Sequence, residues 1–500
     1  MQYAIMKKAL FSVLLAAAAV LPAQAQQRNI LLIIADDLGS DSFPLTASAG
    51  ASLPPMPNIS ALKNSGVLFR NTYAQPTCSP TRATILTGRY TFRTGIGQQV
   101  TAASGQLTAA EFTLPEAFAA NPGLNYSLAM FGKWHLNAGA GSNDTPRTFG
   151  GWPHFAGTIS GALPDYSNWT KVTNNVTSTV TSYATTELTN DVIAWIASRP
   201  AGTPWFAWAA YNAPHTPFHF PPAHLHSFGA AAATDRNQYE AMCEALDTEV
   251  GRLLAAVNLA NTHVIFIGDN GTPGSVIQTP YTNAHSKGGL YEGGVRVPMI
   301  IAGPDVVSPN RNHDGPVHSV DLYSTILELA GINASTTQPA ANPIDSTSLL
   351  PILKNTVPVS RTVFSQVFGP DYTTTAGRVI KDASGYTLLQ YDDGREELYN
   401  IATSPNQTSN LLGTSITSAA QSAYAAMKLQ LANYSVTGIP NEPLVHSWFT
   451  QNSGRYARIY ETDASQSAQT AVTTWNRGAG VQTLPVYAGV QQEDYSGNRV

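Results

Sequence analysis

Two pairs of side chains that could hold a metal ion each follow an apolar segment of the chain. Asp36 and Asp37 follow the first such segment, and Asp269 and Asn270 follow a later one. Carboxylate and amide oxygens are the ligands that Ca²⁺ prefers, and they suit Mg²⁺ less well, because Ca²⁺ takes about six to eight oxygens. Either pair alone is typical of a helix cap or a turn. Two pairs in matching positions indicate a metal site.

Basic side chains follow two further apolar segments. Lys133 and His135 are two positions apart, so in an extended chain they share one face, and His215 follows another apolar segment. Lys287 lies in a glycine-rich loop. Together these residues predict a cationic lining opposite the metal, which suits a small dianion or a transferring oxyanion group. A lone loop histidine or lysine is usually structural, so the prediction depends on their convergence.

Cys78 lies just before a helix expected at Pro80–Leu86, and Arg82 lies one turn inside that helix. A helix N-terminus favours an anion, so we expect a lowered pKa for this thiol. The alternative is an ordinary buried thiol. The other cysteine, Cys243, falls on the apolar stripe of a helix expected at Tyr239–Ala256, and we expect it to be a core residue that is not paired with Cys78.

The elements that must position these residues alternate between strands and helices, which predicts an α/β fold with a central, largely parallel or mixed sheet between helices. In such sheets ligands bind at the carboxyl ends of the strands, where the residues above lie. The expected strands are Ile30–Ala35, Ser127–Phe131, Trp205–Ala210, His263–Ile267 and Val297–Ala302. Further helices are expected at Leu114–Ala120, Thr185–Ala197 and Val320–Leu329.

After about residue 342 the pattern predicts a smaller α+β subdomain with an antiparallel sheet. Its expected strands are Arg361–Phe368, Arg378–Lys381, Tyr386–Tyr391 and Glu396–Asn400, and Ser418–Asn433 is expected to form a covering helix. The predicted organisation is therefore a signal peptide at 1–25, a catalytic domain at 26–341, the subdomain at 342–435 and a polar tail at 436–500. The tail is compatible with the start of an appended β-rich module.

The termini and the composition bear on location and partners. Lys7 and Lys8, the apolar run Ala9–Leu21 and an Ala-Gln-Ala site predict a cleaved signal peptide, and hence a secreted or periplasmic protein. No later stretch reaches the roughly 20 apolar residues of a membrane span, so none is expected in the mature chain. With 27 basic against 32 acidic residues, a net charge of −5 argues against nucleic-acid binding. Two cysteines exclude a disulfide scaffold.

The motif Cys78-x-Pro80-x-Arg82, followed by Thr87-Gly88-Arg89, resembles the signature of the type I (formylglycine-dependent) sulfatases of the alkaline-phosphatase-like superfamily. The resemblance covers about residues 29–433. Other segments resemble the later blocks of that family in order: Gly132–Leu136, Ala213–Pro217, Asp269–Gly271, Lys287–Pro298, Val320–Gly331 and Asp392–Tyr399. The resemblance implies an alkaline-phosphatase-like fold and the activity of a sulfuric ester hydrolase, similar to an arylsulfatase.

The resemblance also implies a mechanism. A formylglycine-generating enzyme would oxidise Cys78 to formylglycine, and the hydrated aldehyde, a gem-diol activated by Ca²⁺, would attack the sulfur of a sulfate monoester and lead to release of inorganic sulfate. The implied metal ligands are Asp36, Asp37, Asp269, Asn270 and the converted Cys78. Arg82 and Lys133 would hold the formylglycine, His135 is the candidate base, and Lys133, His215 and Lys287 would bind sulfate. Whether His215 or Lys287 protonates the leaving oxygen stays open.

Two departures and two alternatives accompany this resemblance. Asn137 replaces the family's glycine, and the region Gly150–Lys171, where substrate preference would be encoded, has an unfamiliar pattern. A phosphate or phosphonate monoester hydrolase of the same superfamily is one alternative, although such enzymes tend to carry histidine where this chain has Asn270. The other is a non-catalytic, calcium-stabilised secreted binding protein. The expected substrate is a sulfated glycan or a small aryl or alkyl sulfate. The tail faintly resembles the start of YHYH-domain proteins.

Overall fold

The computed structural model describes residues 27–139, 141–356, 361–372, 375–413 and 416–434, together with five short strands of the tail. Those strands are β16 Val445–Trp448, β17 Ala457–Glu461, β18 Thr474–Asn476, β19 Val481–Thr483 and β20 Val490–Glu493. The predicted signal peptide and most of the tail lie outside the described residues. Of the two tail stretches that resemble YHYH-domain proteins, only the parts in β17 and β19 are described. No helix in the described part of the chain is long and apolar enough to cross a membrane.

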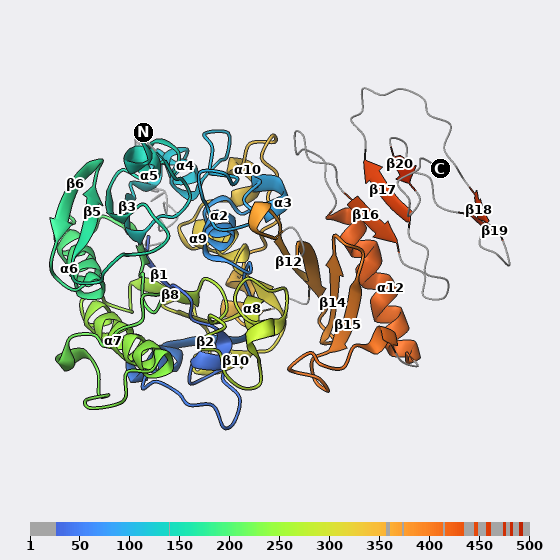
Figure 1. Ribbon diagram of the computed structural model, residues 1–500. Coiled ribbons are helices and arrows are strands. Elements are labelled where there is room, and N and C mark those ends of the chain that lie inside the picture. The colour runs from blue at the N-terminus through green and yellow to red at the C-terminus, as the bar shows by residue number, and fades with distance from the viewer. Residues whose placement is uncertain are drawn as a thin grey trace, which may run out of the picture.

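A mixed sheet of eleven strands forms the centre of the larger part of the described chain (Figure 1). The strand order is β10-β2-β9-β8-β1-β7-β3-β4-β5-β6, and β11 pairs with β2. The bounds are β1 Asn29–Ala35, β2 Gly66–Tyr73, β3 Ser127–Lys133, β4 Phe155–Thr158, β5 Trp169–Thr173, β6 Val176–Val180, β7 Trp205–Ala210, β8 Thr262–Gly268, β9 Arg296–Ala302, β10 Arg311–His313 and β11 Val317–His318. The neighbours β8, β1, β7 and β3 are parallel, whereas β9 runs antiparallel to β8 and β2. This confirms the predicted α/β fold.

Helices cover both faces of the sheet, because successive side chains of each strand point to opposite sides. In β1, Ile30, Leu32 and Ile34 belong to one core, while Leu31 and Ile33 belong to the other. The first core is closed by α2 Cys78–Thr87, α4 Leu114–Ala119, α9 Asp321–Leu329 and α11 Leu350–Leu353. The second is closed by α1 Pro57–Leu62, α6 Ala184–Ala197 and α7 Asp235–Ala255. The short helices α3 Thr91–Thr94, α5 Thr145–Thr148, α8 Glu292–Val295 and α10 Ala334–Thr337 lie in the connections.

Several strands were not anticipated from the sequence. The apolar start of β2 is broken by Arg70 and Asn71, where the pairing register with β9 shifts. The outermost strand, β6, is mostly polar, and four of its five residues are exposed. Polar or interrupted strands at the margins of a sheet lack the continuous apolar run that identifies a central parallel strand.

The C-terminal part forms a four-stranded antiparallel sheet, as predicted. Its strands are β12 Val363–Val367, β13 Gly377–Lys381, β14 Tyr386–Tyr391 and β15 Glu396–Asn400, paired in that order. The helix α12 Ser418–Asn433 packs on one face through Met427 and Leu431, and Figure 1 shows it beside β14 and β15. The opposite face packs against Leu290 of the larger part. The sheet is therefore joined to the segment that carries Lys287.

Candidate active site

Four parallel strands end side by side and carry the candidate residues at their carboxyl ends. Asp36 and Asp37 follow β1, Asp269 and Asn270 follow β8, Lys133 ends β3, and His215 lies five residues beyond β7. The main chain ties the first two loops together, because the N–H of Asp37 donates to Asp269 Oδ1 at 3.0 Å. The topology thus brings together residues that lie more than 200 positions apart in the chain.

Three carboxylates and one thiol form the centre of this cluster. Asp36, Asp37, Asp269 and Cys78 are buried, and each offers a ligand atom within 4.8 Å of the others. The amide nitrogen of Asn270 donates to Asp37 Oδ1 at 2.8 Å and to the carbonyl of Gly271. Its buried oxygen, Oδ1, accepts no hydrogen bond from the described residues. Carboxylates and an unpartnered amide oxygen are hard donors, so this set fits the Ca²⁺ that the resemblance implies.

Each of the three carboxylates has a cationic partner. Lys133 Nζ donates to Asp36 Oδ2 at 2.6 Å, and Lys287 Nζ lies 2.6 Å from Asp37 Oδ1. Arg82 donates to Asp269 Oδ2 through Nη2 at 2.7 Å and through Nε at 3.2 Å. Its Nη1 also donates to the carbonyl of Lys133 at 2.8 Å, so Arg82 connects the ends of β8 and β3. The formal charges of these six side chains cancel.

These charges shift the pKa values of two carboxylates in opposite directions. Burial raises the pKa of Asp37, but Lys287, His215 and Lys133 together outweigh it and hold the pKa below its usual range. The pKa of Asp269 is raised, because burial and the nearby charge of Asp36 outweigh the influence of Arg82. The cations of the cluster therefore stabilise the ionised form of Asp37, but they do not fully offset the cost of ionising Asp269.

Cys78 begins α2, with Thr77 as the N-cap residue, so the helix starts two residues earlier than predicted. Its thiol donates to Asp36 Oδ1 at 3.3 Å. Burial and the charge of Asp36 raise the pKa of this thiol to about 12. The prediction of a lowered pKa was wrong, because desolvation and a neighbouring carboxylate outweigh the helix N-terminus. Cys78 and Cys243 are both buried and free, and Cys243 is the unpaired core residue that was predicted.

The two histidines follow different strands, His135 after β3 and His215 after β7. His215 Nε2 is 3.8 Å from Asp37 Oδ2, and its Nδ1 donates to the carbonyl of Thr216 at 2.8 Å. Burial, together with Lys133 and Lys287, lowers the pKa of His215 to about 4. His135 is only 8 % exposed, and its Nδ1 has no hydrogen-bond partner among the described residues. Burial lowers the pKa of His135 well below its usual value, and both histidines are neutral at pH 7.

Three further residues hold the loops after β1, β7 and β8 in place. The sequence interpretation did not single them out. The hydroxyl of Thr272 accepts from the N–H of Gly39 at 3.2 Å and donates to Asp41 Oδ1 at 2.7 Å, which joins the two acidic loops. Tyr166 donates to the carbonyls of Asn212 and His215. Asp41 could have been identified from its position shortly after the Asp36-Asp37 pair. No sequence signal pointed to Tyr166 or Thr272.

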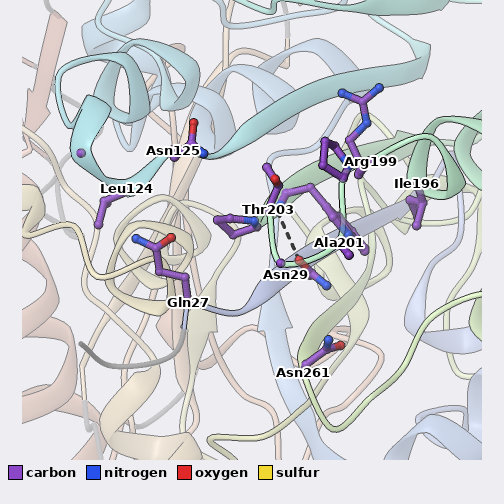
Figure 2. A pocket seen from close by; sticks show the side chains of 14 residues that line it. Gln27, Asn29, Leu124, Asn125, Ile196, Arg199, Ala201, Thr203 and Asn261 are labelled. Atoms are coloured by element: carbon purple, nitrogen blue, oxygen red, sulfur yellow. Dashed lines mark hydrogen bonds between the residues drawn. The ribbon is translucent and has the colours of Figure 1, made fainter. Parts of the chain in front are cut away.

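A cavity of about 550 Å³ lies at the opposite end of the strands (Figure 2). Asn29 begins β1, Trp205 begins β7, and Asn125 and Asn261 precede β3 and β8. The described residues that line the cavity include no acidic residue, histidine or cysteine. It therefore offers neither metal ligands nor an acid–base pair, and the candidate site is the buried cluster at the carboxyl ends.

Comparison with known proteins assigns the class of this site. The sequence profile of the sulfatase family matches residues 28–332, and that of the C-terminal region of N-sulphoglucosamine sulphohydrolase matches residues 283–436. The chain belongs to the sulfatase family: it is a type I sulfatase of the alkaline-phosphatase-like superfamily and thus a sulfuric ester hydrolase.

Individual relatives agree with this assignment. A sulfatase of Formosa agariphila is 29 % identical over 485 residues, covering 77 % of this chain and 85 % of the relative. Human N-acetylgalactosamine-6-sulfatase is 27 % identical over 370 residues, covering 68 % of each chain. The crystal structure of Ps i-CgsB in complex with k-i-k-neocarrahexaose has a TM-score of 0.68 at 24 % identity, covering 82 % of this chain and 93 % of that one. This last likeness shows the shared fold.

Proposed function

We propose that the chain is a secreted or periplasmic sulfatase that releases inorganic sulfate from a sulfate monoester, using formylglycine made from Cys78 together with Ca²⁺. The observation that carries the proposal is the convergence at one buried sheet edge of Cys78, three carboxylates and a cationic lining. Maturation would require a formylglycine-generating enzyme. The predicted signal peptide at 1–25 supports export. The division into a catalytic domain at 26–341, a subdomain at 342–435 and a tail at 436–500 stays a prediction.

The implied groups would occupy the cluster in a defined way. Asp36, Asp37, Asp269 and the free Oδ1 of Asn270 would hold Ca²⁺ beside residue 78. Hydrated formylglycine supplies an oxygen nucleophile for sulfur, and Ca²⁺ supplies positive charge that favours its ionised form. Mg²⁺ suits the cluster less well, because it requires near-ideal octahedral geometry and usually binds only one or two carboxylates together with several waters.

The chain's own residues bind, orient and move protons. Arg82 and Lys133, both fully buried, anchor the carboxylates around position 78 and fix its geometry. His215 and Lys287 lie nearer to solvent, with side chains 15 % and 21 % exposed, so they face an incoming ester. With Lys133 they would hold the sulfate oxygens, and one of His215 and Lys287 would give a proton to the leaving oxygen.

His135 is the candidate base that restores the resting state after sulfur transfer. Its ring is buried at the end of β3, and one ring nitrogen lacks a partner among the described residues. A neutral imidazole with a free lone pair can accept a proton.

A sulfated glycan is the favoured substrate over a small aryl or alkyl sulfate. One relative is named for a sulfated amino sugar, N-acetylgalactosamine-6-sulfate, and one structural neighbour is described in complex with a carrageenan oligosaccharide. These names belong to those proteins and support the proposal by similarity.

The proposal is tested by peptide mass spectrometry at residue 78, combined with assays of aryl sulfate and sulfated saccharide hydrolysis. We expect the peptide to carry an aldehyde instead of a thiol, and we expect Cys78→Ala to release no sulfate above background. The matched control is Cys243→Ala, which removes the other buried thiol, outside the site. Active protein with an unmodified Cys78 would refute the formylglycine mechanism.

The same assays address the two alternative functions. Faster hydrolysis of an aryl phosphate or phosphonate ester than of any sulfate ester would favour the phosphoester alternative. Calcium binding without turnover of any ester, in protein whose residue 78 remains a thiol, would favour a binding protein.

A further inference from the structure

Two polar residues at the rim of the site, Tyr372 and Gln99, have no role in the mechanism above. Tyr372 ends the short turn η7 Pro370–Tyr372, which connects β12 to β13. A Cβ atom added to Gly288 would lie 3.0 Å from its phenol oxygen, so this oxygen lies against the residue that follows Lys287. The phenol donates to Gln99 Oε1 at 3.4 Å. Both side chains are partly exposed.

The segments that carry these two residues are fixed to each other. Gln98 donates to Asp371 Oδ2 through Nε2 at 2.6 Å, and its Oε1 accepts from the N–H of Asp371 at 3.0 Å. The side chain of Gln98 is only 2 % exposed. The N–H of Phe368 also donates to the carbonyl of Gly97 at 3.2 Å. The C-terminal sheet thus holds the turn with Tyr372 directly against the segment with Gln99.

The same segment is also tied to the helix that carries the nucleophile position. The N–H of Val100 donates to Ser79 Oγ at 2.9 Å, and Ser79 is the residue after Cys78 in α2. Burial raises the pKa of the Tyr372 phenol, and the charges of Lys287 and Cys78 also act on it, which is consistent with a phenol that faces the site. The rim pair therefore has a defined position relative to Cys78.

We propose that Tyr372 and Gln99 bind a hydroxyl group on the alcohol part of the substrate. They would thus select sulfate esters of saccharides over sulfate esters whose alcohol has no hydroxyl group besides the esterified one. With the sulfate at Cys78 and the ester oxygen near Lys287, the alcohol must extend towards partly exposed residues. A phenol and a primary amide offer both donors and acceptors. Their mutual hydrogen bond is long, so both can exchange it for bonds to a hydroxyl group.

This inference rests on the proposed function, and its experiment separates the two. The full chain and its Tyr372→Phe and Gln99→Ala variants are assayed on a sulfated saccharide that the protein hydrolyses and on an aryl sulfate without hydroxyl groups. Loss of one hydrogen bond predicts that the kcat/KM ratio, saccharide over aryl sulfate, falls about 3- to 10-fold, mainly through KM. Tyr386→Phe, which removes a phenol elsewhere in the C-terminal sheet, is the control and should leave that ratio unchanged.

The possible outcomes are distinct. A fall in the ratio for both variants, with unfolding temperatures close to that of the unsubstituted chain, supports the assignment. An equal loss on both substrates, or no loss on the saccharide, overturns it while the sulfatase proposal stands. Hydrolysis of aryl sulfates alone, with no saccharide sulfate accepted, also overturns it. Absence of sulfate release from every ester refutes the proposed function itself.

Discussion

At the scale of single residues, Asp269 shows why the cluster favours a bound cation. Its Oδ2 accepts two hydrogen bonds from Arg82, and its Oδ1 accepts one from the N–H of Asp37. Even so, burial and the charge of Asp36 keep its pKa raised. Because ligand atoms of Asp36 and Asp269 lie within 4.8 Å of each other, the negative charge of Asp36 disfavours ionisation of Asp269 unless further positive charge is present. A divalent cation among the carboxylates would supply that charge.

We therefore predict that Asp269→Asn weakens calcium binding at least about 10-fold, because affinity at such sites follows the number of charged ligands. Sulfate ester hydrolysis should fall with it. Calorimetric titration of the metal-free protein with CaCl₂ measures the affinity. Asp393→Asn is the matched control, since Asp393 is 45 % exposed and pairs only with the exposed Arg395 in the described contacts. Equal affinities in the two variants would contradict the assignment.

The sequence was sufficient to predict that most of these residues gather at one site, because both acidic pairs, Lys133 and His215 each follow an apolar run that had to be a buried strand. Cys78 and Arg82 at a helix start, and Lys287 in a glycine-rich loop, carried no such strand signal. The sequence was insufficient to predict their pairing. Lys133 contacts Asp36, and Arg82 contacts Asp269. These pairings depend on the strand order, in which β7 lies between β3 and β1 and β8 lies on the other side of β1. Strand order is a long-range property that local spacing does not encode.

At the scale of elements, α2 shows how a local rule can locate a helix and still misplace its start. Proline is tolerated throughout the first turn, where its missing N–H has no partner in any case. Pro80 is the third residue of α2, not the first, so the helix begins at Cys78. All ten residues of α2 are buried, so the helix has no solvent-exposed face by which an amphipathic pattern could mark its ends.

The loop between β4 and β5 is a second element whose role depends on packing. A Cβ atom added to Gly161 would lie 2.3 Å from ring atoms of His135. We predict that Gly161→Ala displaces this ring and lowers turnover at least about 10-fold, since small misplacements of reacting groups are costly. The thermal unfolding temperature should change little.

Gly123→Ala is the control for this substitution. A Cβ atom at Gly123 would meet no atom within 4 Å. Steady-state hydrolysis of the same sulfate ester measures both variants. Turnover by the Gly161 variant equal to that of the Gly123 variant would show that contact with this loop does not set the position of His135.

At the scale of the whole molecule, the C-terminal sheet is part of the site's support. Ser365 of β12 donates to the carbonyl of Ala74, and the N–H of Gln366 donates to Gln75 Oε1, just before the segment with Cys78. Tyr291, four residues after Lys287, donates to Glu397 of β15. The change in the pattern of expected strands near residue 342 indicated a separate subdomain, but contacts over such sequence separations could not be predicted from it.

A buried ion pair joins the two parts. Glu292 of α8 and Lys381 of β13 are 1 % and 6 % exposed, with Nζ 3.2 Å from Oε1. Tyr73 of β2 donates to both carboxylate oxygens of Glu292 at 3.1 Å, and Lys381 also contacts its phenol. Burial lowers the pKa of Lys381 even though Glu292 opposes this. The charge of Lys381 is therefore costly to bury and depends on its partner.

We predict that Glu292→Gln destabilises the folded protein by about 3 kcal/mol, because it leaves the Lys381 ammonium buried without a counter-charge. Urea-induced unfolding, followed by tryptophan fluorescence, measures the loss. Combining Glu292→Gln with Lys381→Met removes the stranded charge, and replacing a buried pair with apolar groups is often neutral. The double variant should therefore regain a large part of the stability that the single variant loses. If the double variant is as unstable as Glu292→Gln alone, the cost comes from lost hydrogen bonds to Tyr73 and not from the buried charge, and the ion pair is not what joins the two parts.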